Sequence, residues 1–252
     1  MKTAIITGAS SGLGREFARQ LTDVFPEIEC CWLIARREDR LEEIAREMVG
    51  VETVCLPLDL CDSMSFTTLQ EKLAAEKPEV AMLINNAGCG YLSSVADSPA
   101  RWIAAMTDLN VRALSLVTNL ALPHMTAGSH ILNISSIASF CPTPRMTVYS
   151  ASKAYVTAFS RGLREELRSR DISVTAACPG PMATSFLDTG RIRGNSRTFD
   201  RLPYCQPAQV ARGSIQAALR GRAVYTPRLF YKLYRGLTKV LPQALAVKIA
   251  GT

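Results

Sequence analysis

The chain has 252 residues, of which 48% are hydrophobic and 20% are charged, a balance typical of a globular protein with a sizeable core. Its eight cysteines lack Cys-x-x-Cys spacing and it has two histidines, which argues against a metal site and favours reduced, buried thiols. A formal net charge of +7 either favours anionic ligands or simply maintains solubility. Because the basic residues form no patch interleaved with aromatic residues, we expect no nucleic-acid partner.

No uninterrupted apolar run reaches the roughly 18 residues that a membrane-spanning helix needs. No signal-like apolar region precedes the first predicted strand. With reduced cysteines in addition, the sequence predicts a cytoplasmic protein.

Apolar runs of strand length alternate with amphipathic helical segments along the chain. The predicted strands are 3–7, 30–35, 51–58, 80–84, 129–134, 172–177 and 223–225. The predicted helices are 15–21, 38–48, 63–75, 98–122, 149–169 and 207–219. No hairpin signal separates the strands, so we expect one α/β domain over residues 1–252. Its predicted core is a Rossmann-like, doubly wound parallel sheet of about seven strands, with helices on both faces.

A glycine-rich turn joins the first strand to the first helix. Such a turn lets backbone N–H groups approach a pyrophosphate, and the helix N-terminus adds favourable charge. The spacing differs from the common Gly-x-Gly-x-x-Gly form, but its position favours dinucleotide binding. The expected cofactor-binding residues of this turn are Gly8, Ser10, Ser11, Gly12, Leu13 and Gly14.

Arg36 and Arg37 follow the second strand, where the ribose of a dinucleotide is recognised. A carboxylate here would bind the 2′-hydroxyl of NAD, whereas an arginine would pair with the 2′-phosphate of NADP. No acidic residue occurs before Glu38, which already enters the next helix. We therefore expect NADP(H), with a solvated arginine pair as the alternative.

Tyr149 and Lys153 are four residues apart and share one face of a predicted helix. An ammonium close to a phenol favours the phenolate and would lower the tyrosine pKa from about 10 to about 7. Such a group would donate and accept protons near neutral pH. The same spacing is common on ordinary solvated helices, so its meaning depends on the rest of the chain.

Several further polar or glycine-containing segments directly follow predicted strands. Ligands of parallel sheets bind at the carboxyl ends of the strands, so we expect these segments to meet along one edge with the glycine turn and the arginines. The segments are Asp59-Leu60, Asn86-Ala87-Gly88, Ser136 and Pro179-Gly180.

In combination, these motifs resemble the short-chain dehydrogenase/reductase family over residues 3–185, in particular NADP-preferring members of the hydroxysteroid dehydrogenase and 3-oxoacyl reductase type. The resemblance implies that Asp59 and Leu60 flank the adenine and that the Asn86-Ala87-Gly88 turn lies beside the cofactor. It also implies cofactor contacts from Tyr149, Lys153, Pro179, Gly180, Met182 and Thr184.

The resemblance further implies a catalytic tetrad of Asn110, Ser136, Tyr149 and Lys153. Tyr149 would protonate the developing alkoxide during reduction or deprotonate the alcohol during oxidation. Lys153 would lower the phenol pKa and hold the nicotinamide ribose. Ser136, thirteen residues before Tyr149, would orient the substrate oxygen, and Asn110 would support a water relay behind Lys153.

The loops that build substrate pockets in this family are apolar here, which suits a bulky hydrophobic ketone or secondary alcohol such as a steroid. Reduction of a 3-oxoacyl thioester of CoA or a carrier protein is the alternative. A nucleotide sensor or scaffold on the same fold is a third possibility. We expect reduction to be the direction in cells. The expected substrate-lining residues are Cys89, Tyr91, Ser136, Cys141, Met146, Tyr149 and Phe186.

Two segments of this domain lie outside the alternation of strands and helices. Residues 185–206 are predicted to form a lid loop, with arginines at 191, 193, 197 and 201. Residues 227–252 are apolar and basic and fit an amphipathic helix pair that covers the cleft, packs on a partner subunit or touches a membrane surface. The family resemblance also implies a homodimer or homotetramer formed through helices 98–122 and 149–169.

Overall fold

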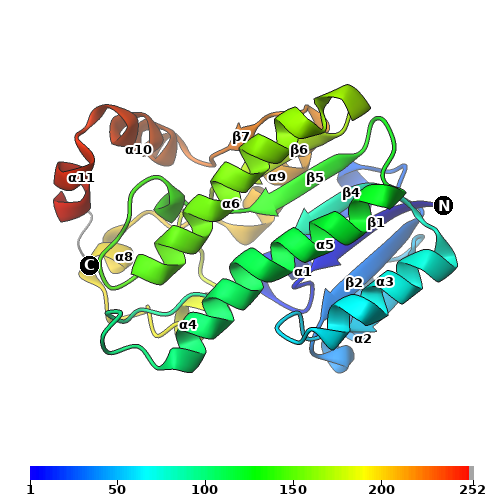
Figure 1. Cartoon of the computed structure of the whole chain (residues 1–252), viewed down its shortest axis with the longest axis horizontal. Coiled ribbons are helices and arrows are strands. Elements are labelled where there is room, and N and C mark those ends of the chain that lie inside the picture. Colours follow the sequence, from blue (N-terminus) through cyan, green and yellow to red (C-terminus); the bar gives the residue numbers. More distant parts are fainter. Residues whose placement is uncertain (250–252) are drawn as a thin grey trace.

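A seven-stranded parallel sheet forms the centre of the computed structural model, which describes residues 1–249 apart from the side chains of Arg197, Gln243 and Ile249 (Figure 1). The strand order is β3-β2-β1-β4-β5-β6-β7, and all neighbouring strands are parallel. This confirms the predicted Rossmann-like, doubly wound sheet. The strands are β1 Lys2–Thr7, β2 Cys30–Ala35, β3 Glu52–Pro57, β4 Glu79–Asn85, β5 His130–Ile134, β6 Ser173–Ala177 and β7 Val224–Tyr225.

Helices cover both faces of the sheet because successive strand residues point to opposite sides. Ile5 packs in the core cluster on one face, while its neighbour Ile6 packs in the cluster on the other. Figure 1 looks onto the face covered by α3 Met64–Glu76, α5 Leu114–Ala121 and α6 Thr147–Glu166. The opposite face is covered by α1 Gly12–Val24, α2 Glu38–Glu47 and α9 Pro207–Leu219.

The predicted long helix 98–122 forms as a continuous helical run from Ala100 to Ala121, although the sequence did not predict the π-helical turn inside it. The helix begins at Ala100, with Pro99 at its cap, and α4 ends at Thr107. A π-helical turn, Asp108–Ala113, separates α4 from α5. A short 3-10 turn, Leu122–His124, then precedes β5. A π-turn bulges the backbone and often marks a functional site, and this one carries Asn110.

The segment 185–206 contains two short helices, α7 Ser185–Thr189 and α8 Arg197–Arg201, instead of a simple loop. Leu187 and Ile192 are buried in a cluster that also contains Tyr149 and Met146. These buried apolar side chains give the segment a packed structure that its polar, arginine-rich composition does not reveal.

The C-terminal segment forms α10 Leu229–Val240 and α11 Gln243–Ile249, while residues 250–252 of the predicted tail lie outside the described part. In Figure 1 these helices gather with α8 at one end of the molecule. Across residues 1–249, no helix is both long enough and apolar enough to cross a bilayer.

Candidate active site

One cavity of about 790 Å³ follows the carboxyl edge of the sheet and receives nearly all the site residues that the sequence predicts. The turn after β1, the arginines after β2, Asp59 and Leu60 after β3, and the Asn86-Ala87-Gly88 turn after β4 all line it. Two predicted residues, Gly14 and Asn110, do not reach its wall. The sheet thus brings together segments that are up to 180 residues apart in the chain, as the strand-end argument predicts.

The glycine turn is locked against the end of β4. Gly8 adopts a positive φ of 66°, and Asn86 donates its side-chain amide to the carbonyl oxygens of Thr7 and Gly8 at 3.0 and 3.2 Å. A Cβ on Gly14 would lie 2.0 Å from the oxygen of Gly8. Gly14 therefore lets α1 pack closely against the turn, and it lies behind the wall of the cavity.

The end of the cavity near β2 is cationic and lacks a carboxylate at the ribose position. Arg37 donates to the hydroxyl of Ser10 at 3.3 Å, and both residues line the cavity with Arg36. Glu38 is the first residue of α2, as the sequence suggests. A glycine turn with a positive φ and a hydroxyl beside two arginines fit a phosphorylated dinucleotide.

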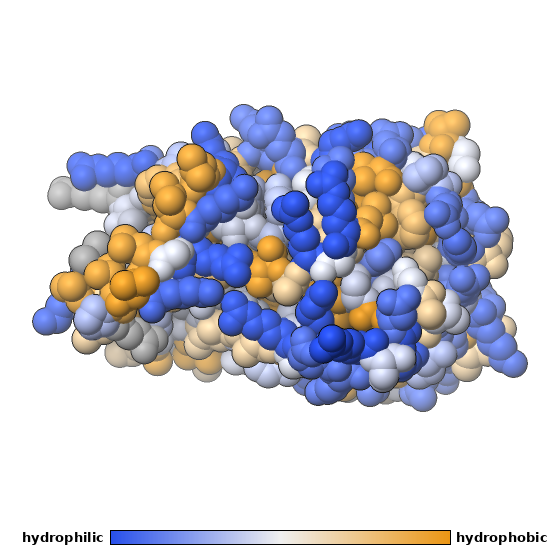
Figure 2. Space-filling model, turned by 90° about the horizontal axis from the view of Figure 1, so that it is seen from above, coloured by the Kyte–Doolittle hydropathy of each residue, from blue (hydrophilic) through white to orange (hydrophobic). Residues whose placement is uncertain are grey.

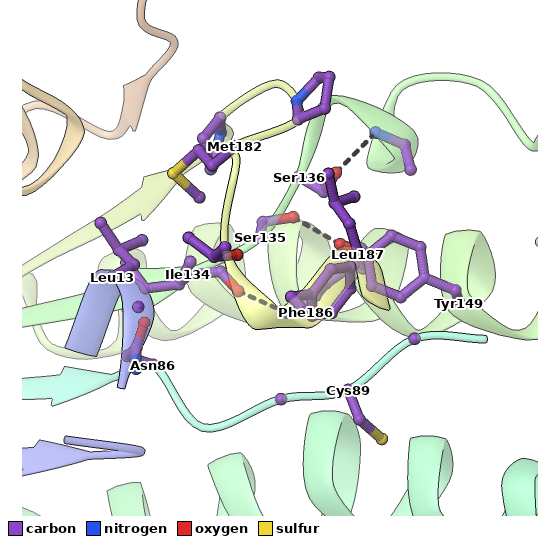
Figure 3. Close-up of a pocket in the computed structure, with 18 of the residues that line it drawn as sticks. Leu13, Asn86, Cys89, Ile134, Ser135, Ser136, Tyr149, Met182, Phe186 and Leu187 are labelled. Atoms are coloured by element: carbon purple, nitrogen blue, oxygen red, sulfur yellow. Dashed lines mark hydrogen bonds between the residues drawn. The ribbon is translucent and has the colours of Figure 1, made fainter. Parts of the chain in front are cut away.

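Ser136 and Tyr149 form the polar point at the other end of the cavity. Figure 3 shows them with Phe186 and Leu187, away from Leu13 and Met182. Tyr149 is buried, its ring packs 5.7 Å from that of Phe186, and burial raises its pKa to about 12 although a hydrogen bond with Ser136 lowers it. The neighbouring Ser135 bonds instead to the carbonyl of Lys153 and to Thr157, so Ser136 is the serine that meets Tyr149.

Lys153 is also buried, and its ammonium is directed to the protein backbone. Its Nζ donates to the carbonyl of Ile134 at 2.8 Å and lies 5.8 Å from the centre of the Tyr149 ring. Burial lowers the pKa of Lys153 to about 8. Burial is thus the main cause of both shifts, and it moves the pKa of Tyr149 away from the neutral value that the sequence predicts.

Asn110 lies behind the cavity wall and holds it in place. Its side chain accepts from the N–H of Cys89 at 2.9 Å and donates to the carbonyl of Cys89 at 2.8 Å. It also donates to Ser152 at 2.9 Å. A Cβ on Gly88 would come within 2.9 Å of Asn110 and 3.3 Å of Lys153, so these two side chains lie close to one another across the glycine. Ser152 is a contact that no sequence motif marks.

The substrate end of the cavity is lined by all the predicted apolar residues and by others that the sequence analysis missed. Cys89, Tyr91, Cys141, Met146 and Phe186 are where the loop argument expects them. The additional residues come from the 185–206 segment, from α10 and from the residue that directly follows α10. The amphipathic pattern of the tail was the signal that could have found those of α10. The additional residues are Phe199, Leu202, Phe230, Tyr231, Tyr234, Leu237 and Leu241.

The glycine turn, the cationic ribose end and the buried serine, tyrosine and lysine define a dinucleotide-dependent site that opens into a hydrophobic pocket. Residues 2–192 match the family model described as short chain dehydrogenase. The chain therefore belongs to the short-chain dehydrogenase/reductase family, NAD(P)-dependent oxidoreductases that interconvert CH–OH and C=O groups.

Individual relatives extend this comparison. A very-long-chain 3-oxoacyl-CoA reductase of Anas platyrhynchos is 35% identical over 192 residues, which cover 72% of this chain but only 60% of that protein. A short-chain dehydrogenase from Sphingobium yanoikuyae in complex with NADPH is 26% identical, with a TM-score of 0.81 and coverage of 97% of this chain and 98% of that one. The bulky-bulky ketone specific alcohol dehydrogenase from Comamonas testosteroni is 26% identical, with a TM-score of 0.72 and coverage of 97% and 96%.

Proposed function

We propose that this protein is an NADPH-dependent reductase of a bulky, hydrophobic ketone of about the size of a steroid. The observation that carries the proposal is the apolar wall around the Ser136 and Tyr149 hydroxyls, built from Met146, Phe186 and Leu187 with aromatic residues of the later segments. A wall of this kind favours a ligand that is apolar except at one carbonyl. The structural relative specific for bulky-bulky ketones supports this choice.

The preference for NADPH rests on the cationic ribose end. Arg37 and Ser10 are already hydrogen-bonded to each other at 3.3 Å, and Arg36 lines the same part of the cavity. A 2′-phosphate accepts charge-assisted hydrogen bonds from such groups, whereas a 2′-hydroxyl cannot use the second cation. The NADPH-bound structural relative supports this assignment.

The proposed chemistry follows from the two hydroxyls. A ketone oxygen placed between Ser136 and Tyr149 accepts a hydrogen bond from each, and Tyr149 transfers its proton to that oxygen. The pKa of about 12 keeps the phenol protonated at neutral pH, which suits a proton donor in reduction. Bound NADPH supplies the hydride. Lys153 provides the buried positive charge, and Asn110 acts as a positioning residue by fixing the backbone of Cys89.

Assembly and cellular location belong to the same proposal. Leu116 on α5 and Tyr155 on α6 are exposed large side chains on the two helices that the family resemblance assigns to the subunit interface. We expect a cytoplasmic homodimer or homotetramer that uses this face. Light scattering of the purified protein tests this expectation.

Reduction of a 3-oxoacyl thioester is the second candidate, favoured by the 35% identity to the long-chain reductase. The arginines of the 185–206 segment would bind the phosphate of a thioester carrier, but two of them already have other contacts. Arg191 stacks on the ring of Trp102 at 5.1 Å, and Arg193 pairs with Asp188 at 3.1 Å. These contacts make the thioester the weaker candidate.

A screen of NADPH consumption over steroids, small cyclic ketones and 3-oxoacyl thioesters tests the proposal. We expect the highest kcat/KM for bulky ketones, and a loss of about 10²- to 10⁴-fold in kcat for Tyr149→Phe with NADPH binding retained. Activity confined to thioesters would select the second candidate. Turnover that survives in Tyr149→Phe would refute the assigned proton donor.

A further inference from the structure

The C-terminal helices expose an unusual concentration of large apolar side chains. Of the twelve exposed large hydrophobic residues in the described part of the chain, six lie on α10 or α11. Monomeric proteins rarely leave such a group uncovered unless it meets a partner or a membrane. The six are Leu229, Phe230, Leu233, Leu237, Val240 and Leu245, here called the tail patch.

The patch forms one stripe of an amphipathic helix. Residues 229, 233, 237 and 240 follow the spacing of one helix face. The opposite face is anchored on the protein by Tyr231, which is fully buried. Leu229, Leu233 and Val240 are 70%, 66% and 84% exposed, so packing within the chain leaves this stripe open. In Figure 2, hydrophobic residues gather at the end of the molecule formed by α10 and α11, next to hydrophilic side chains.

Basic residues flank the stripe without acidic neighbours in the segment. Residues 227–252 contain five lysines and arginines and neither aspartate nor glutamate. In a symmetric pair of chains this face would meet its own copy, bringing like charges together without a carboxylate to offset them. Anionic lipid headgroups supply the opposite charge, and acyl chains receive the apolar stripe. The basic residues are Arg228, Lys232, Arg235, Lys239 and Lys248.

The tail patch is continuous with the wall of the catalytic cavity. Phe230 and Leu237 line that cavity and are also 51% and 54% exposed, so their side chains lie on both surfaces. Tyr234, which lies between them on α10, and Leu241, which directly follows α10, also line the cavity. An apolar path therefore runs from the exposed stripe to the pocket that contains Tyr149.

From these observations we infer that α10 and α11 dock on an anionic lipid bilayer, with the apolar stripe in the interface and the lysines at the headgroups. The mouth of the pocket then faces the membrane. A lipid-soluble ketone enters the pocket from the bilayer, a consequence that rests on the proposed function.

Co-sedimentation with vesicles tests the docking without substrate or cofactor. We expect binding to vesicles of phosphatidylcholine and phosphatidylglycerol, reduced at least tenfold in Leu229→Gln/Leu233→Gln/Val240→Gln. None of these residues lines the cavity, and glutamine preserves helix propensity. The matched control replaces three exposed apolar residues far from the tail in the sequence and should bind like wild type: Val49→Gln/Met64→Gln/Val95→Gln.

The charge requirement has its own test. Lys232→Gln/Lys239→Gln should weaken binding to the anionic vesicles by about 25-fold, or about fivefold per cation, and change binding to pure phosphatidylcholine little. The control Arg46→Gln/Arg168→Gln removes two exposed cations outside the tail and should retain binding. Leu233→Trp gives an independent signal, because its emission should shift to shorter wavelength when it enters the interface.

Three results would overturn the inference. They are absence of binding by wild type to the anionic vesicles, equal binding by wild type and the triple glutamine variant, and a wild-type dimer that dissociates in that variant and binds no vesicles. The last result would assign the patch to a second copy of the chain.

For substrate entry, the vesicles should stimulate reduction of a membrane-dissolved ketone by wild type but not by the triple glutamine variant, while both reduce a water-soluble ketone equally. If no ketone is reduced by either protein, the proposed function fails but the docking result stands.

Discussion

The ring of Tyr231 on α10 lies directly against the backbone of Gly180, which follows β6 some fifty residues earlier in the chain. A Cβ at Gly180 would come within 2.3 Å of that ring. Tyr231 is fully buried, and its hydroxyl donates to the carbonyl oxygen of Pro203 at 2.7 Å. This pair ties the end of β6, the 185–206 segment and α10 together at the substrate end of the pocket.

Gly180→Ala should therefore destabilise the protein, because the buried Tyr231 ring cannot move aside freely. Overpacking of this kind costs about 1–3 kcal/mol, which lowers the melting temperature of a chain of this size by several degrees. Thermal unfolding measures the change. Gly162→Ala in α6, where a Cβ meets nothing within 4 Å, is the matched control and should raise stability. An unchanged melting temperature in Gly180→Ala would show that α10 does not pack on the β6 end in solution.

Arg37→Asp should reverse the cofactor preference. Loss of a charged hydrogen bond to the 2′-phosphate, worth about 1.5–3 kcal/mol, should lower kcat/KM for NADPH by about 10- to 150-fold. The value for NADH should stay the same or rise, because a carboxylate at this position can bind the 2′-hydroxyl. Arg46→Asp, an exposed change in the last turn of α2, is the control. Equal losses with both cofactors would exclude Arg37 as the phosphate ligand.

The two reaction directions should depend on pH in opposite ways. Burial raises the pKa of Tyr149 to about 12, so the phenol is protonated across the neutral range. Reduction uses that proton and should not accelerate as the pH rises, whereas oxidation needs the phenolate and should accelerate by up to about tenfold per pH unit. Profiles of kcat/KM in both directions test this. Tyr155→Phe on the same helix should leave both profiles unchanged, and a reduction rate that climbs with pH would contradict the assignment.

Lys153→Met should stabilise the protein, most strongly at neutral pH. Burial lowers the pKa of Lys153 in the folded protein from 10.5 to about 8. Between these two pH values the unfolded chain holds a proton that the folded protein has lost, so the stability of wild type rises as the pH rises from 8 to 10.5. Below pH 8 the buried charge of Lys153 lowers the stability of wild type by roughly 3 kcal/mol. Lys153→Met removes this cost but also loses the hydrogen bond to Ile134, which reduces the expected gain by about 1 kcal/mol. Urea unfolding at pH 7 and pH 10 should show the variant's advantage shrinking.

Lys77→Met is the control, because it removes an exposed lysine at the end of α3. If the Lys153→Met advantage were the same at pH 7 and pH 10, a buried charge would not be its cause.

Asn110→Ala should impair catalysis through the backbone of Cys89. Without the amide, the partly buried N–H and carbonyl of Cys89 lose their partners, which costs about 1–3 kcal/mol of stability. We expect kcat to fall more than KM rises, because the 88–90 segment then holds the substrate end less rigidly. Asn119→Ala, at an exposed position of α5, is the control. Ser152→Ala removes only one partner of Asn110 and should have a smaller effect than Asn110→Ala.

Features encoded by neighbouring residues could be predicted from the sequence. The apolar runs predicted the strands because the inner strands β1, β2, β4, β5 and β6 are almost entirely buried. Arg36, Arg37, Asp59 and Asn86 could be placed on one edge because parallel strands end at the same side of a sheet. The π-turn at Asn110 could not be predicted in this way. Its side chain is satisfied by Cys89 and Ser152, which lie 21 and 42 residues away in the chain.

The local sequence thus determined the class of sheet and the composition of the dinucleotide edge, since both depend on periodicity and on residues next to strand ends. Only the tertiary structure decided the ionisation of Tyr149 and Lys153, because burial and distance set these pKa values and both depend on what surrounds the helix. It also decided that α10 forms part of the pocket wall. That placement depends on Tyr231 packing on Gly180, a contact between distant segments that no local pattern encodes.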